Sequence, residues 1–120
     1  MNIEKVTKNG ISCAVVRSDS TVITDTQSAL DLLIDIRYGA LTDNIVIDKK
    51  LIDRNFFILS SGLAGEILQK ITDYGGRIAI YGDFSGYTSK PLRDFMYENN
   101  KGNTVFFAGS EAEAVDRICK

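Results

Sequence analysis

The chain has 120 residues, a formal net charge of -2 and 44% hydrophobic residues, which fits one compact soluble domain over residues 1–120. The weak negative charge and the lack of a basic run argue against nucleic-acid binding, and the apolar runs are far too short for a membrane span. The absence of histidine argues against zinc sites and Ser-His catalysis. We expect a cytoplasmic protein without a signal peptide, in which Cys13 and Cys119 are reduced thiols.

The first predicted element is a β-hairpin. Asn9 and Gly10 suit a two-residue type I′ turn, because both central residues of that turn need positive φ. The turn would join strands at residues 3–7 and 11–16. Residues 21–23 are too short to assign and fit either a small strand or a packed loop.

Four amphipathic helices and three further strands follow. Thr24 and Gln27 have the spacing of a capping box, which predicts a helix that begins there and ends near Gly39. Ser110 and Glu113 have the same spacing and predict the start of the last helix. The remaining predicted elements are strands at residues 45–48, 77–81 and 104–108, and helices that begin after Gly62 and after the Thr88–Ser89 pair.

This order of elements predicts an α/β fold with an N-terminal hairpin followed by alternating helices and strands. Such alternation implies a mixed, mostly parallel sheet with right-handed crossovers and helices packed on it. Residues 45–47 and 78–81 are apolar without alternation, which is typical of strands covered on both faces.

The candidate site lies at the carboxyl ends of the predicted parallel strands, where open α/β sheets bind their ligands. Asp83 directly follows a covered strand, and hydroxyl residues stand where nearby helices begin. A helix start favours an anion because it carries unpaired N–H groups and a positive dipole end. The candidate binding residues are Ser60, Ser61, Gly62, Gly65, Asp83, Ser85, Ser89 and Arg93.

Each of these candidates also has a purely structural interpretation. Asp83 either takes part in binding or closes its own loop as an Asx turn. One of Ser60 and Ser61 caps the following helix. The sharper hypothesis is phosphorylation of Ser61, which would add about 1.5 to 2 negative charges at the rim. Arg93 either pairs with Asp83 or binds an oxyanion, or it belongs to a surface ion pair.

The same residues make a poor catalytic set. A lone aspartate among hydroxyls, without histidine or cysteine beside it, lacks a nucleophile and base pair. We therefore assign no catalytic residue, no metal and no cofactor. A magnesium site on Asp48 and Asp83 stays open, but no specific spacing supports it.

Three segments resemble an uncharacterised bacterial family known only as a domain of unknown function. They are GLAGEILQK at residues 62–70, IYGDFSGYTSKPLRDFMYENNKG at residues 80–102 and VFFA at residues 105–108. The resemblance covers residues 44–119 and is specific, because several rare combinations occur in order. It implies no established reaction.

A looser resemblance is to STAS domains, the fold of anti-sigma-factor antagonists. It rests on the order of elements and on Ser60, Ser61, Gly62 and Leu63, which are similar to the Asp-Ser-Ser-Gly-Leu loop of those proteins. The resemblance implies that Ser61 takes the phosphoserine position. Leu59 replaces the usual aspartate, so the resemblance implies the fold more strongly than it implies regulation by a kinase.

These observations favour a cytoplasmic regulatory or binding module. We expect it to dock a protein partner or an anion at the helix start formed by residues 60–64 and at the loop of residues 83–93. Two alternatives stay open. One is a small enzyme or metal- or phosphate-binding protein that uses Asp83 as base or ligand and Arg93 as oxyanion partner. The other is a structural homodimer subunit that pairs through the edge of the first hairpin.

Overall fold

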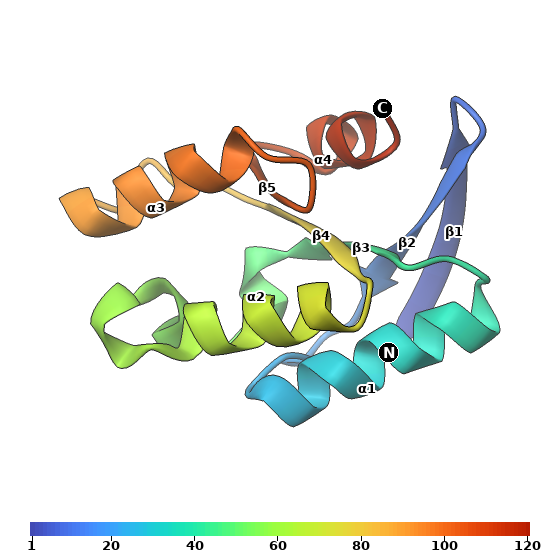
Figure 1. Cartoon of the computed structure of the whole chain (residues 1–120), viewed down its shortest axis with the longest axis horizontal. Coiled ribbons are helices and arrows are strands. Elements are labelled where there is room, and N and C mark those ends of the chain that lie inside the picture. Colours follow the sequence, from blue (N-terminus) through green and yellow to red (C-terminus); the bar gives the residue numbers. More distant parts are fainter.

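The computed structural model describes all residues 1–120 and contains one five-stranded sheet (Figure 1). The strands lie side by side in chain order, with β1 antiparallel to β2 and with β2 to β5 all parallel. Their bounds are β1 Asn2–Lys8, β2 Ile11–Arg17, β3 Asn44–Asp48, β4 Arg77–Tyr81 and β5 Val105–Ala108. The helices are α1 Thr26–Gly39, α2 Leu63–Asp73, α3 Lys90–Asn100 and α4 Glu111–Ile118. The predicted α/β architecture is confirmed.

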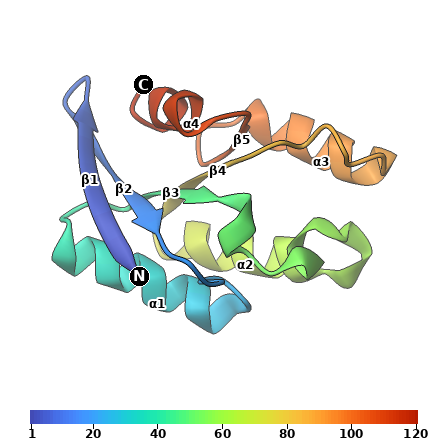
Figure 2. The same cartoon turned by 180° about the vertical axis from the view of Figure 1, so that it is seen from behind.

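Three helices cover one face of the sheet and α4 covers the other. Side chains of α1, α2 and α3 share one core with Ile45, Ile47 and Ile80, whereas α4 packs on Val15 and Val46. Figures 1 and 2 show α4 across the sheet from α1 and α2. Right-handed crossovers between strands added in one direction place successive helices on the same face. Only α4, which follows the last strand, is free to fold onto the opposite face.

The central strands are covered on both faces, as their apolar runs predict. Ile45, Val46 and Ile47 are all fully buried, and so are Ile78 and Ile80 of the next strand. Successive side chains of a strand point to opposite faces, so a run without polar residues fills both cores. No helix combines the length and the apolar character that crossing a lipid bilayer requires.

The hairpin turn is confirmed, and the start of α1 differs by one residue from the prediction. Asn9 has φ 56° and Gly10 has φ 76°, as a type I′ turn requires. The capping box of α1 joins Asp25 to Ser28, not Thr24 to Gln27. The Ser28 N–H donates to the Asp25 carboxylate at 2.8 Å, and the Ser28 hydroxyl accepts from the Asp25 N–H at 3.1 Å. Serine thus replaces the expected glutamine in the reciprocal bond.

Two further local predictions are refined. Residue Ile23 forms an isolated parallel bridge with Ile52, so this segment has one strand-like contact. Ser110 caps α4 by accepting from the Glu113 N–H at 3.2 Å. The Glu113 carboxylate accepts from the Gly109 N–H and not from that of Ser110, so the return bond of the capping box reaches one residue further back.

Candidate functional site

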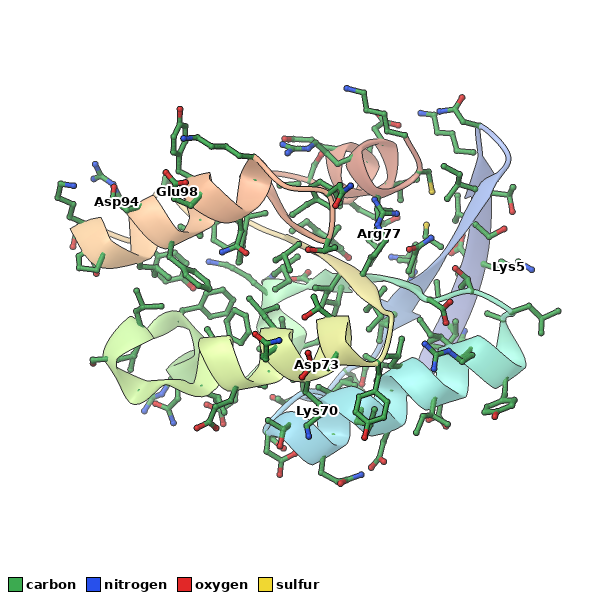
Figure 3. The ribbon with its side chains drawn as sticks, viewed as in Figure 1. Lys5, Lys70, Asp73, Arg77, Asp94 and Glu98 are labelled. Carbon is green, nitrogen blue, oxygen red and sulfur yellow. The ribbon has the colours of Figure 1, made fainter.

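Two loops meet at the carboxyl edge of the sheet. The β3–α2 loop contains the short 3-10 turns η1 Lys49–Leu51, η2 Arg54–Phe57 and η3 Leu59–Ser61, and the β4–α3 loop runs over residues 82–89. The Phe57 ring stacks on the Tyr87 ring, with centroids 5.4 Å apart and planes inclined by 12°. The centroid of the Phe84 ring lies 6.1 Å from that of Phe57. Ring side chains fill the space between the ribbons of α2 and α3 in Figure 3. The predicted convergence of the two loops is therefore present, and its contact is aromatic.

Lys49 ties the two loops together. Its ammonium group donates to the main-chain carbonyl of Asp83 and lies 4.7 Å from the centroid of the Tyr87 ring and 5.6 Å from that of Phe84. Gly82 makes room for this side chain: it has φ 153°, and a Cβ at this position would lie 2.7 Å from Cγ of Lys49. A side chain at residue 82 would thus displace Lys49.

The Asp83 carboxylate closes its own loop. It accepts from the Ser85 N–H at 2.9 Å and from the Ser85 hydroxyl at 2.6 Å, which is the geometry of an Asx turn. These bonds from Ser85, and to a smaller degree the charge of Lys49, lower the pKa of the Asp83 carboxyl. No ion pair forms between Asp83 and Arg93, whose side chain is exposed.

The paired serines at the start of α2 have different surroundings. The Ser61 hydroxyl donates to the Asn55 carbonyl at 2.7 Å and accepts from the Leu63 N–H at 3.2 Å. The predicted serine cap is wrong: the N-cap residue of α2 is Gly62, with φ 79° and no side-chain capping bond, and Ser61 reaches the Leu63 N–H from one position earlier. Ser60 is exposed. No hydrogen bond joins either serine to Asp83.

The remaining predicted residues are spread along the rim. Ser89 is the N-cap of α3 and accepts from the Leu92 N–H at 3.4 Å, with Pro91 in the first turn. Gly65 is exposed, with open space around its Cβ position. The structure therefore joins Asp83 to Ser85, and it holds the serine pair and Arg93 as separate surface features.

A cationic cleft beside the aromatic contact was missed by the sequence analysis. We call it the edge cleft. It has a volume of about 460 Å³ and is lined by Thr21, Lys49, Lys50, Ile52, Asp53, Arg54, Phe57 and Tyr87. None of its three cations forms an ion pair, and its carboxylate, Asp53, accepts from the Asn55 N–H. The sequence signal was three basic residues within six positions directly after a strand.

A neighbouring cleft of about 430 Å³ lies at the ends of β2, β3 and β4 and shares Thr21 and Lys50 with the edge cleft. Its charges are internally balanced. Arg17 binds the Glu111 carboxylate with two guanidinium nitrogens and reaches Glu4 at 3.1 Å, and the Tyr81 hydroxyl donates to Glu111 at 3.2 Å. Burial, followed by the charge of Glu111, raises the pKa of Tyr81 to about 12, and Arg17 lowers the pKa of Glu111. This network fastens α4 to the sheet.

Asp48 ends β3 and Asp83 lies two residues after β4, but the two carboxylates do not assemble into a metal site. Asp48 caps η1 by accepting from the Lys50 N–H at 2.9 Å. The structure contains no group of three or more cysteine, aspartate or glutamate side chains arranged to hold a metal ion. The edge therefore offers cations and rings to a ligand, and its carboxylates bind nearby main-chain groups.

A family model described as "Domain of unknown function (DUF4180)" matches residues 8–118. No curated protein and no solved structure matches the chain. The match confirms the predicted relationship to an uncharacterised domain family, while the STAS-like relationship stays a prediction.

Proposed function

The chain belongs to the DUF4180 family, whose description names no activity, and we propose that the protein is a regulatory binding module. In this proposal the module docks an acidic segment of a partner protein in the edge cleft. The rim that we predicted from sequence, residues 60–64 and 83–93, borders the docking surface.

One observation carries this proposal. Lys49, Lys50 and Arg54 converge on one cleft and form no ion pair there, in a chain whose net charge is -2. Ammonium and guanidinium groups bind carboxylates through charge-assisted hydrogen bonds, and a guanidinium fork binds them in bidentate geometry. Phe57 and Tyr87 add apolar contact area beside the charges. A glutamate- or aspartate-rich segment with an apolar residue next to it matches this surface.

Lys49 would transmit the effect of docking to the β4–α3 loop. Its ammonium group is shared between the Asp83 carbonyl and the ring of Tyr87. A bound carboxylate competes for that ammonium group, so docking would loosen the β4–α3 loop. This coupling is what we propose as the regulatory element of the module.

Phosphorylation of Ser61 would oppose docking. The Ser61 hydroxyl donates a hydrogen bond to the main-chain carbonyl of Asn55, the residue next to Arg54. A phosphate there brings about 1.5 to 2 negative charges near the cations of the edge cleft. It would pair with these cations and so compete with the carboxylates of the partner. Intact mass measurement of protein from its own host tests this clause: an adduct of about 80 Da supports it, and its absence under all growth conditions argues against it.

The docking proposal is tested with a fluorescent glutamate-rich peptide in an anisotropy titration. We expect binding that weakens with added salt and that is lost in the double variant Lys50→Gln, Arg54→Gln. The matched control is Lys5→Gln, which removes an exposed cation on β1, outside the cleft. Equal binding by the wild type and by the double variant would show that the edge cleft is not the docking site.

A pull-down from host lysate identifies the partner. Wild type is compared with Asp83→Ala, which opens the loop, and with Ser61→Asp, which adds a negative charge to the rim. We expect both variants to lose the same protein. Equal recovery by all three would place the interaction elsewhere on the surface.

The alternatives have less support. The enzyme hypothesis needs Asp83 and Arg93 to act as a pair, and the structure forms no such pair. The homodimer hypothesis retains the unpaired edge of β1, which carries Lys5 and Lys8, and charges of this kind disfavour edge-to-edge pairing. The STAS-like hypothesis retains the order of elements and the Ser60–Ser61 pair as its support.

A further inference from the structure

We propose that the opposite end of the sheet holds a second site, which binds a small phosphate-bearing ligand through Arg77, Arg117 and Lys120. These residues line a cleft of about 310 Å³, which we call the arginine cleft. It shares no residue with the edge cleft, so this proposal does not depend on the proposed function.

The fold brings the three cations together from two distant parts of the chain. Arg77 is the first residue of β4, Arg117 lies in the last turn of α4, and Lys120 follows two residues after that helix. Figure 3 shows Arg77 between the ribbons of β4 and α4. The rest of the lining is Asn100, Gly102, Asn103 and Phe106. No aspartate or glutamate side chain lines the cleft.

The two arginines are held in place by neutral acceptors. Arg77 donates from Nε to the Asn103 carbonyl at 2.7 Å and from Nη1 to the Ile118 carbonyl at 2.8 Å. Arg117 donates from Nη2 to the Asn100 carbonyl at 3.0 Å. Carbonyl oxygens orient a guanidinium without cancelling its charge. The Nη2 group of Arg77 makes no hydrogen bond within the protein, so it stays available to a ligand.

One aromatic ring fixes both guanidinium groups further. The central guanidinium carbons lie 5.6 Å (Arg77) and 5.2 Å (Arg117) from the centroid of the Phe106 ring, within the range of cation–π attraction. Phe106 is 5% exposed, so it is a rigid platform. Anchoring of this kind reduces the conformational entropy that an arginine loses when it binds a ligand.

A structural role accounts for part of this arrangement. The Ile118 and Asn100 carbonyls are at the ends of α4 and α3, and cations commonly satisfy such terminal carbonyls. The two helix ends contribute about half a negative charge each, against three full positive charges from the side chains. Capping of the two helix ends therefore does not neutralise the three positive side chains of the cleft.

The chemistry of the cleft fits phosphate oxygens. Arginine forks bind phosphate in bidentate geometry, and a lysine adds a third, mobile charge. The volume suits a ligand at the small end of the range for metabolite pockets. A ligand with two phosphate groups could contact both arginines at once, so we choose inorganic pyrophosphate as the probe.

The test is a titration of the ¹⁵N-labelled protein with pyrophosphate at low salt, followed by NMR. We expect saturable shifts of the Gly102 and Asn103 amides and of the Arg77 Nε–Hε signal. Affinity should fall about tenfold or more in the double variant Arg117→Gln, Lys120→Gln, because two charge-assisted contacts are lost. It should be unchanged in Lys5→Gln and in the edge-cleft variant Lys50→Gln, Arg54→Gln.

Several results would overturn the proposal. They are the absence of saturable shifts, an equal affinity in the Arg117→Gln, Lys120→Gln variant, or shifts confined to residues 49–54. The single variant Lys120→Gln should fold normally, because the Lys120 side chain is exposed and makes no hydrogen bond. We expect it to bind pyrophosphate more weakly than the wild type, and this loss could not be attributed to unfolding. The two sites are separate if the Arg117→Gln, Lys120→Gln variant loses pyrophosphate binding and keeps peptide binding, and if the Lys50→Gln, Arg54→Gln variant does the reverse.

Discussion

Gly82 offers the sharpest test of how the carboxyl edge is built. Its φ of 153° lies in a region that other residues rarely adopt, and an added Cβ would lie 2.7 Å from Cγ and 2.8 Å from Cδ of Lys49. Gly82→Ala therefore strains the backbone and pushes Lys49 away from Tyr87 and from the Asp83 carbonyl.

The expected loss of stability is the sum of the backbone strain at residue 82 and the lost contact of Lys49 with Tyr87. A residue held in a sparsely populated region costs about 1–3 kcal/mol, and loss of an exposed cation–π contact costs about 0.5–1 kcal/mol more. We expect the free energy of unfolding to fall by about 1.5–4 kcal/mol, a large share of the roughly 5–15 kcal/mol typical of a domain.

The matched control lies in the same loop. Gly86 has no atom within 4 Å of its Cβ position and no positive φ, so Gly86→Ala should be neutral or slightly stabilising. Urea denaturation followed by circular dichroism measures both variants. Equal free energies of unfolding for the two variants would refute this explanation of the loop, and with it the coupling that we assign to Lys49.

Three further predictions concern the core, the α4 contact and the thiols. Phe57→Ala should lower the free energy of unfolding by about 3–5 kcal/mol, because it removes a buried ring that stacks on Tyr87; a loss below about 1 kcal/mol in urea denaturation would contradict the packing. Arg17 lowers the pKa of Glu111 in the folded protein, so this carboxylate stabilises the fold above pH 4.5, the ordinary pKa of glutamate. The contribution is lost as pH falls through the lowered folded-state pKa. The melting temperature of Glu111→Gln should therefore fall less on acidification than that of the wild type. Burial raises the pKa of Cys13 to about 12, so a disulfide reagent should modify it only when urea unfolds the chain, and rapid modification of the native protein would contradict its burial.

The architecture could be predicted because its signals are local. Asn9 and Gly10 specify a turn by themselves, and the apolar run at residues 45–47 specifies a strand that is covered on both faces. The start of α1 was displaced by one residue because Asp25 and Ser28 satisfy the same bonds as the expected Thr24 and Gln27. Sequence spacing alone does not distinguish neighbouring caps that are equally capable of these bonds.

The site could be predicted only as a location. The sequence placed the β3–α2 and β4–α3 loops on a common edge, but the contact between them depends on Phe57 meeting Tyr87, thirty positions later. Arg77 and Arg117 were missed for the same reason, since a strand start and a helix end become neighbours only through the packing of α4. Side chains that meet across elements leave no periodic signal in the chain.

The order of the strands has a consequence for synthesis. Because each strand pairs with the one made just before it, every new helix and strand can dock on a finished surface while the chain is still being translated. The exception is α4, which reaches back to the first hairpin through Asp116 and Lys8 and through Glu111 and Arg17. Helix α4 therefore closes the second face of the sheet, and a ribosome-bound chain that stops after β5 should leave that face open to chaperones.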